Sequence, residues 1–460
     1  MLFSSLPFLF YFLPCALGLY FLAPRRLKNA ALLLSSLVFY AWGEPRFVLF
    51  MAAAILQGYA AARLMERYPA RRRLLLTLSA VLSLGLLGYC KYADFLISGF
   101  NAVTGLSVPL LRITLPIGIS FYTFQILSYV IDVYRGDAPA QRGLIDLAAY
   151  IAMFPQLVAG PIVRYTDVAP QLQSRTHTVQ DAALGARRFV LGLGKKVLLA
   201  NVLYELVTVY QQSGQKTVLL TWMYAAAYMM HVYFDFSGYS DMAIGLGRMF
   251  GFHFLENFNY PYISLSVTEF WRRWHISLST WFRDYVYIPL GGNRVSRGKW
   301  VRNILVVWGL TGLWHGADWN FLLWGLYYGV LLLIEKLWLG KYLERLPKAL
   351  RWLLCMVIVC IGWVMFNLTD FAQMRAALAR MFSFTHVALS QSLAADVSIV
   401  PPLLWMLPAL VFSTPVCRRV HLGESYGAEI VRNVVCLALL AVCIVFSVSA
   451  TFNPFIYFRF

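Results

Sequence analysis

Long apolar stretches recur along the whole chain, and they constrain the possible folds more than any other feature of the sequence. About 20 apolar residues cross the hydrocarbon core of a bilayer as a helix. Only helices or closed barrels satisfy their backbone groups in lipid, and the alternating pattern of barrel strands is absent. Hydrophobic residues make up 60% of the chain and charged residues only 13%. The sequence therefore predicts an all-α, polytopic membrane protein.

The apolar stretches predict roughly 11–12 transmembrane helices. They lie near residues 6–23, 30–42, 46–62, 74–90, 113–133, 144–160, 189–210, 219–234, 304–334, 350–368, 401–413 and 433–451. The stretch 304–334 is expected to form two segments with a break near His315. Neither repeats nor low-complexity tracts interrupt this pattern, so we expect one membrane domain over residues 1–460.

The balance of charge is strongly basic, with 39 Lys and Arg against 21 Asp and Glu and a net charge of +18. In a soluble protein this excess would suggest nucleic acid as a partner. In a membrane protein it is typical of cytoplasmic loops that face anionic lipid headgroups. We therefore expect membrane lipids, and no nucleic acid, among the partners.

Residues 252–303 mix apolar and charged residues over a length that exceeds an ordinary loop. Within this segment Trp271, Trp274, Leu278, Trp281 and Tyr285 recur at helical spacing on one face. Thr268 and Glu269 provide a polar start, and Gly291 with Gly292 a stop. The pattern predicts an amphipathic helix that lies in the membrane interface or enters it as a re-entrant segment, and a plain surface anchor would show the same pattern.

Ionisable side chains inside apolar segments are energetically unfavourable and commonly face a cavity, so they are candidates for a functional site. They are few: His315 with Asp318, His275, and the group His231, Asp235 and Asp241. His231 and Asp235 are four residues apart on one helix face, where a structural pair explains them.

For His315 by itself a structural role is favoured, but Gly309, Gly312 and Gly316 leave room around it for backbone or substrate. A neutral, partly desolvated imidazole is a competent general base.

Other catalytic machinery is missing from the sequence. It contains no G-x-S-x-G elbow, no H-E-x-x-H pair and no G-x-x-x-x-G-K-[ST] loop. The seven cysteines lie mostly within apolar stretches and show no C-x-x-C spacing. We therefore expect histidine chemistry with no metal and no disulfide framework.

Several long motifs together resemble one known family. They are YFDFSGYSDMAIGLG, NFNYPYISLSVTEFWRRWHISLSTWFRDYVYIPLGGNR and LWHGADWNFLLWGL, with LPIGISFYTFQILSYVIDVYRGD and AGPIVRY earlier in the chain and NPFIYFRF at its end. Over nearly the whole chain these stretches resemble the membrane-bound O-acyltransferase superfamily, and within it the bacterial alginate O-acetylation subfamily.

This resemblance implies a helical bundle around a central tunnel, with His315 as the catalytic histidine and His275 as a second polar partner. It implies transfer of acetyl from a cytoplasmic thioester, with acetyl-CoA the expected donor, across the bacterial inner membrane to a polysaccharide. The expected partners are a periplasmic polysaccharide acetyltransferase and a polymer synthase and export complex. A smaller role for His275 predicts a smaller loss of activity in His275→Ala than in His315→Ala.

The residues expected to contact acetyl-CoA are Arg294, Arg297, Trp314 and Asp318. The two arginines belong to a basic stretch, residues 272–302, that could attract its phosphates, although lipid headgroups explain the same charges. Asp318 departs from the family pattern, in which an amide or small polar residue is expected after WHGA. A carboxylate close to the His315 ring would raise the pKa of that histidine.

Two other functions compete with acyl transfer. A proton-coupled transporter of polysaccharide or lipid could use His231, Asp235, His275 and His315 as a proton relay, but the sequence lacks the two similar halves that transporters commonly show. A haem protein with His275 and His315 as axial ligands is a more distant alternative.

The ending NPFIYFRF, residues 453–460, places Tyr457 between aromatic residues. An aromatic belt at the membrane surface explains such a motif. The motif also resembles the F-x-Y-F-x-F ending of a small companion peptide of the related D-alanylation system, which implies that Tyr457 carries the acetyl group as an aryl ester. A base such as His315 would make its phenol nucleophilic.

Tyr457→Phe removes only the hydroxyl, so it should stop acetylation while expression stays normal. Mass spectrometry of the donor-treated wild type should find about 42 Da, one acetyl group, added to the C-terminal peptide as a covalent intermediate. A fully active Tyr457→Phe protein would leave the motif as a membrane anchor.

Overall fold

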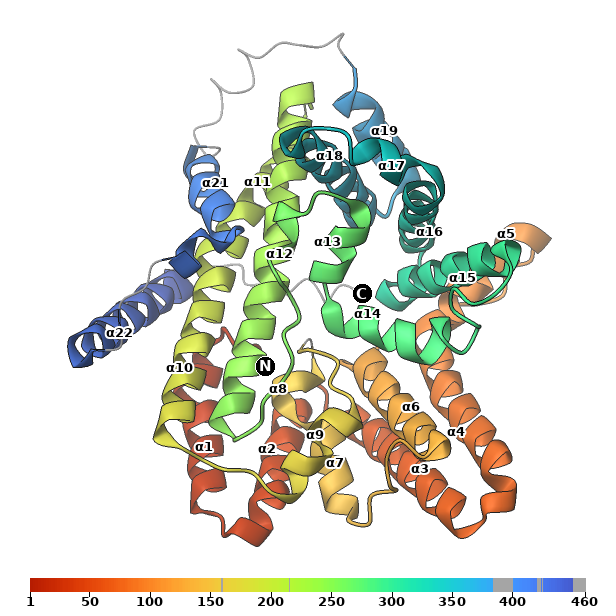
Figure 1. Ribbon diagram of the computed structural model, residues 1–460, viewed down its shortest axis with the longest axis vertical. Coiled ribbons are helices and arrows are strands. Elements are labelled where there is room, and N and C mark those ends of the chain that lie inside the picture. Colours follow the sequence, from red (N-terminus) through yellow and green to blue (C-terminus); the bar gives the residue numbers. More distant parts are fainter. Residues whose placement is uncertain (159, 215, 384–399, 420–422, 424, 450–460) are drawn as a thin grey trace. The chain divides into compact units, whose positions relative to one another are not determined.

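The computed structural model describes all residues except 159, 215, 384–399, 420–422, 424 and 450–460. Within the described residues every regular element is a helix, which confirms the predicted all-α class (Figure 1). The chain forms two compact units. Unit 1 comprises residues 1–190 and 239–255, and unit 2 comprises residues 191–238 and 256–460.

Five of the described helices are long and apolar enough to cross a membrane. They are Pro45–Arg67, Pro69–Thr104, Trp319–Leu343, Lys348–Asn367 and Tyr426–Ser449. Two shorter apolar helices, Phe8–Leu22 and Pro402–Phe412, add to this set. A multi-pass membrane protein is thereby supported, and the larger number of spans expected from hydropathy stays a prediction.

Unit 1 is built mainly from the N-terminal helices. These are α1 (Leu13–Leu22), α2 (Lys28–Gly43), α3 (Val48–Arg67), α4 (Arg72–Leu87), α5 (Ala93–Thr104), α6 (Ile119–Arg135), α7 (Leu144–Ala152), α8 (Phe154–Leu157) and α9 (Tyr165–Gln173). Helix α6 is buried along most of its length and packs against α3 and α4. Gly118 precedes it in a left-handed conformation, where a Cβ would lie 2.6 Å from the carbonyl oxygen of Leu157.

Two helices pass from one unit to the other: α10 (Val179–Gly194) and α12 (Val218–Met249). In unit 1 the Asp241 carboxylate forms an ion pair with Arg188 at 2.7 Å. This ion pair gives Asp241, one of the ionisable residues singled out from the sequence, a structural partner.

The helices of unit 2 after α10 hold the remaining sequence motifs. They are α11 (Asn201–Gln212), α13 (Val267–Arg273), α14 (Ile276–Phe282), α15 (Arg297–His315), α16 (Trp319–Ile334), α17 (Gly340–Leu343), α18 (Lys348–Asn367), α19 (Phe371–Met381), α21 (Val400–Phe412) and α22 (Tyr426–Ser449). Wider π-helical turns extend three of them: η6 (Lys195–Ala200), η8 (Arg283–Tyr287) and η9 (Glu335–Leu339).

Buried polar groups join η6 to α12 within unit 2. Lys196 and Asp235 form an ion pair, and both side chains are almost fully buried. The Nδ1 atom of His231 lies 2.8 Å from the carbonyl oxygen of Ala200 and donates a hydrogen bond to it. Breaking a buried ion pair by removing one partner is strongly destabilising, so these groups have clear structural roles.

Close backbone contact joins α15 to α16, which are antiparallel and separated by only three residues, as the break near His315 predicted. A Cβ on Gly325 would lie 2.2 Å from the carbonyl oxygen of Trp308, and one on Gly312 2.3 Å from that of Phe321. A Cβ on Gly309 would meet nothing closer than 3.8 Å. Gly312 and Gly325 therefore bring the two backbones together, and Gly309 does not.

Gly325→Ala should lower the thermal unfolding temperature of the purified protein, because its methyl group collides with backbone that cannot rotate away, and overpacking destabilises by about 1–3 kcal/mol. Gly309→Ala is the matched control on α15, and there the better helix propensity of alanine should leave stability equal or higher. Equal unfolding temperatures for the two variants would contradict the close approach.

Candidate active site

The amphipathic segment of unit 2 begins as predicted but is broken at its centre. Ser266 caps α13 by accepting a hydrogen bond from the Glu269 amide at 3.1 Å. The expectation of one continuous helix is wrong, because the chain leaves the helix at Trp274 and His275 has φ 44° and ψ 56°. A left-handed backbone conformation is unusual for a residue other than glycine and is found where the surrounding structure enforces it.

The loop that precedes α13 enforces this break. The Asn259 amide donates to the Arg273 carbonyl at 2.9 Å, and the Ile276 amide donates to the Asn257 carbonyl at 2.9 Å. These bonds satisfy backbone groups at the end of α13 and at the start of α14. Residues 257–259 therefore provide the partners that a continuous helix would have provided itself.

Asn257 also determines which nitrogen of His275 carries the proton. Its Oδ1 accepts hydrogen bonds from the Ser277 amide at 3.2 Å and the Ser277 hydroxyl at 2.9 Å, so this atom is the oxygen of the amide group. His275 Nδ1 lies 3.1 Å from the same oxygen. The carbonyl oxygen of an amide group can only accept a hydrogen bond. Nδ1 of His275 therefore carries the hydrogen, and Nε2 keeps its lone pair.

The environment of His275 favours a neutral ring. The residue is 1% exposed. Burial lowers the pKa of His275 to about 3, so the imidazole stays neutral at physiological pH. Nε2 is buried, and no described residue forms a hydrogen bond with it. His275 therefore presents an unprotonated Nε2 whose lone pair is open to a hydrogen-bond donor, such as a hydroxyl group of a substrate.

His315 ends α15 inside an aromatic environment. Its ring lies 5.0 Å from that of Trp314, 5.1 Å from Trp324 and 5.3 Å from Phe366, each in edge-to-face geometry. The Trp314 ring also contacts His275, with ring centres 5.8 Å apart. These aromatic side chains restrict water around both histidines.

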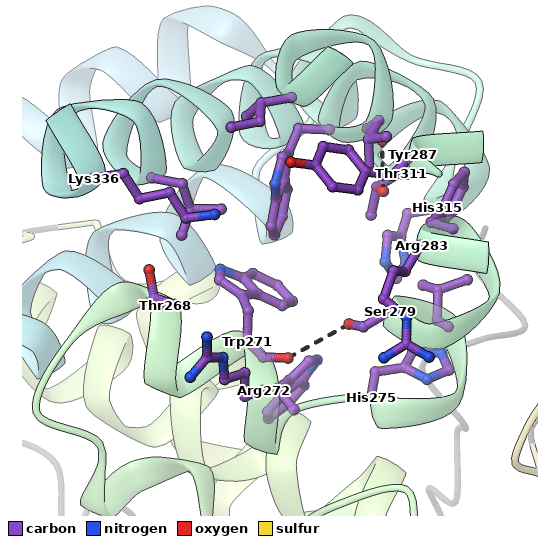
Figure 2. Close-up of a pocket in the computed structure, with 17 residues that line it drawn as sticks. Thr268, Trp271, Arg272, His275, Ser279, Arg283, Tyr287, Thr311, His315 and Lys336 are labelled. Atoms are coloured by element: carbon purple, nitrogen blue, oxygen red, sulfur yellow. Dashed lines mark hydrogen bonds between the residues drawn. The ribbon is translucent and has the colours of Figure 1, made fainter. Parts of the chain in front are cut away.

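One cavity of about 230 Å³ in unit 2 joins the two histidines. Figure 2 shows His275 and His315 at the same end of this cavity, where the walls come from α14 and α15. Ser279 and Thr311 add hydroxyl groups near them, but each is engaged with a backbone carbonyl, at 3.5 Å from Trp271 and 2.8 Å from Val307. The structure therefore brings together the two histidines that the sequence singled out.

None of the four residues expected to contact the donor lines this cavity. Arg294 and Arg297 are exposed and do not line this cavity. Trp314 is buried beside the histidines. The Asp318 carboxylate caps α16 by accepting from the Trp319 amide at 2.6 Å. Tyr457 lies outside the described residues.

Sequence reasoning missed three residues of this region: Asn257, Thr268 as a wall residue, and Lys336. Thr268 and Lys336 line the cavity, and Asn257 accepts a hydrogen bond from Nδ1 of His275. Lys336 could have been found, because it is a charge within the apolar run LLLIEKLWL. An uncharged asparagine in a loop gives no comparable signal.

Comparison with known proteins identifies a family. Residues 138–378, about half of the chain, match the family described as MBOAT, membrane-bound O-acyltransferase family. This segment contains both cavity histidines.

Similar proteins with a named function match most or all of the chain. The chain is 41% identical to the probable alginate O-acetylase AlgI of Azotobacter vinelandii, over 100% of both chains. It is 47% identical to the probable alginate O-acetylase AlgI of Pseudomonas aeruginosa, over 85% of this chain and 76% of that protein. It is also 30% identical to the peptidoglycan O-acetyltransferase of Helicobacter pylori, over 100% of this chain and 98% of that protein.

The tautomer of His275 can be measured directly by ¹⁵N NMR of the histidine-labelled protein in lipid, with the His275→Gln spectrum as assignment. We expect a neutral ring with the hydrogen on Nδ1 throughout pH 5–8, because its lowered pKa lies below that range. In Asn257→Asp the added carboxylate should raise the pKa and produce imidazolium signals near the acidic end.

Asn257→Leu removes the acceptor of the Nδ1 hydrogen, so the His275 hydrogen should no longer be confined to Nδ1. Ser277→Ala, the control, should leave the His275 tautomer unchanged. An unaltered His275 tautomer in Asn257→Leu would contradict this assignment.

Proposed function

Because the chain belongs to the membrane-bound O-acyltransferase family, and is therefore an O-acyltransferase, we propose that it transfers acetyl from acetyl-CoA to a polysaccharide outside the cytoplasm. The observation that carries this proposal is the cavity of unit 2, where the neutral His275 and the aromatic-enclosed His315 meet. Family membership also disfavours the transporter interpretation, and the buried His231 and Asp235 have structural partners.

The cavity supplies an imidazole that can perform both proton transfers of the reaction. The acceptor hydroxyl oxygen attacks the carbonyl carbon of the thioester while its proton passes to an imidazole nitrogen, for which His275 Nε2 is available. The carbon–sulfur bond then breaks. The departing thiolate takes the proton back, which regenerates the neutral base and releases the free thiol.

The walls of the cavity protect the donor during this reaction. Trp271, Trp274 and Trp308 give the cavity largely apolar walls, which offer water few hydrogen-bond partners. Water would compete with the acceptor for the thioester, so a site that excludes it favours transfer over hydrolysis.

The named relatives suggest the acceptor and the setting. Two act, by name, in alginate O-acetylation and one on peptidoglycan. We propose an alginate-like exopolysaccharide as the acceptor, with cellulose or peptidoglycan as the alternatives, and the bacterial inner membrane as the location. A periplasmic polysaccharide acetyltransferase and a polymer synthase and export complex are the proposed partners.

His315→Ala and His275→Ala should each reduce acetyl transfer by about 10²–10⁴-fold, the usual contribution of a general acid or base. The sequence alone predicts a smaller loss for His275→Ala. Its burial and cavity position give reason to expect a comparable loss.

The measurement is thiol release from acetyl-CoA and acetyl incorporation into an acceptor oligosaccharide by the purified protein. His253→Ala changes an exposed histidine of unit 1 and is the control. Near-normal transfer in both cavity variants would exclude the histidine mechanism.

A further inference from the structure

The cavity of unit 2 has a second end that the histidines do not occupy. Figure 2 shows Thr268 and Lys336 on one side of the cavity, with His275 and His315 on the other. Helix packing gives the same separation. Gly329 of α16 lies against Leu305 and Trp308 of α15, so Lys336, about two turns later, extends away from the His315 end.

Positive charge accumulates at this second end, where the Glu335 carboxylate acts on Lys336 but does not itself line the cavity. None of the 17 described residues that line the cavity is acidic, whereas Arg272 and Lys336 both line it. Neither forms an ion pair within the described part of the chain.

The nearby carboxylates are already engaged. Glu335 accepts from the amides of Val267 at 2.8 Å and Thr268 at 3.2 Å. Glu269 binds Arg273 at 2.8 Å. These bonds engage Glu335 with the backbone of α13 and Glu269 with Arg273. Of the three cationic side chains that line the cavity, Arg283 is paired with Asp284, whereas Arg272 and Lys336 remain available to a ligand.

Two buried hydrogen-bond donors face the same end. Trp271 is only 8% exposed, and its Nε1 has no acceptor among the described residues. Figure 2 shows this nitrogen on the side of Thr268 and Lys336. The Thr268 hydroxyl is also buried and forms no hydrogen bond with a described residue. Buried polar groups of this kind normally have a partner, so an acceptor-rich ligand is expected here.

We propose that Thr268, Trp271, Arg272 and Lys336 form a subsite for a phosphate group on the pantetheine arm of the thioester donor, an inference that rests on the proposed function. A phosphate has several acceptor oxygens and more than one negative charge, which suits two cations and two neutral donors. A carboxylate would satisfy fewer of these groups.

The length of the cavity fits this assignment. From Ile304 to His315 its wall follows α15 for eleven residues, roughly 16 Å at 1.5 Å per residue. An extended pantetheine arm separates thioester and phosphate by a comparable length. With the phosphate held at the Lys336 end, the acetyl group reaches the histidines.

The test compares three ligands: pantetheine, 4′-phosphopantetheine, which adds one phosphate, and coenzyme A, which adds an adenosine nucleotide with two further phosphates. Calorimetry on the full-length protein in a phosphate-free detergent gives their dissociation constants. We expect Arg272→Gln and Lys336→Gln each to weaken the two phosphorylated ligands by about tenfold or more, as for loss of a charged hydrogen bond. Binding of pantetheine should not change, which also shows that the variants are folded.

Lys341→Gln is the matched control, because Lys341 is exposed on the neighbouring α17 and lies outside the cavity. It should bind all three ligands as the wild type does. If the wild type binds pantetheine and phosphopantetheine equally, the subsite is overturned. The same holds if Arg294→Gln or Arg297→Gln weakens coenzyme A while the cavity variants do not.

A lipid headgroup is the other source of a phosphate. In that case the variants would lose phosphatidylglycerol that the wild type retains, and all three pantetheine ligands would bind every variant alike, which overturns the donor assignment. The subsite is also separable from the proposed function. Phosphate-dependent binding without any thioester consumption would refute acetyl transfer and leave the subsite in place.

Discussion

The cavity of unit 2 depends on the need of buried backbone groups for hydrogen-bond partners. A helix broken inside a protein leaves amides and carbonyls that must be satisfied elsewhere. Asn257 and Asn259 supply those partners at the junction of α13 and α14. Because the same Asn257 also binds His275 Nδ1, the interaction that permits the break also orients the ring and fixes its tautomer. Asn257 therefore both satisfies the broken backbone and sets which nitrogen of His275 carries the hydrogen.

His315 is positioned by a separate contact, between α15 and α16. The glycine contact between α15 and α16 lets the two backbones approach, and the turn after His315 leaves its ring among Trp314, Trp324 and Phe366. Aromatic packing of this kind is rigid and excludes water. The two histidines thus reach one cavity from independent supports, and a disturbance of either support should misplace only one ring directly.

The sequence predicts those features that depend on local pattern. Apolar length predicted the helical membrane class, and the apolar stretch 304–334 was expected to break near His315, where α15 ends. The periodic tryptophans led to one continuous helix, which is wrong, because side-chain spacing continues across His275 while the hydrogen bonds from residues 257–259 interrupt the backbone. Tertiary hydrogen bonds of this kind leave no periodic signal. Lys336 is a different case, because it and Glu335 are charges within an otherwise apolar run and therefore leave a signal in the sequence.

The two ends of the cavity place opposite demands on their surroundings. A general base must be neutral before it accepts a proton. Cations beside the imidazole would disfavour its protonated form and so weaken it as a base. Cations are stable only where water or a counter-charge can reach them, and Arg272 and Lys336 are exposed side chains at the opposite end from the histidines. A donor with charge at one end of a long neutral arm matches a cavity that is cationic and exposed at one end and apolar and buried at the other. The charged group can bind while still hydrated, and the uncharged thioester is the part that must enter the dry end, so the costly desolvation of phosphate is avoided.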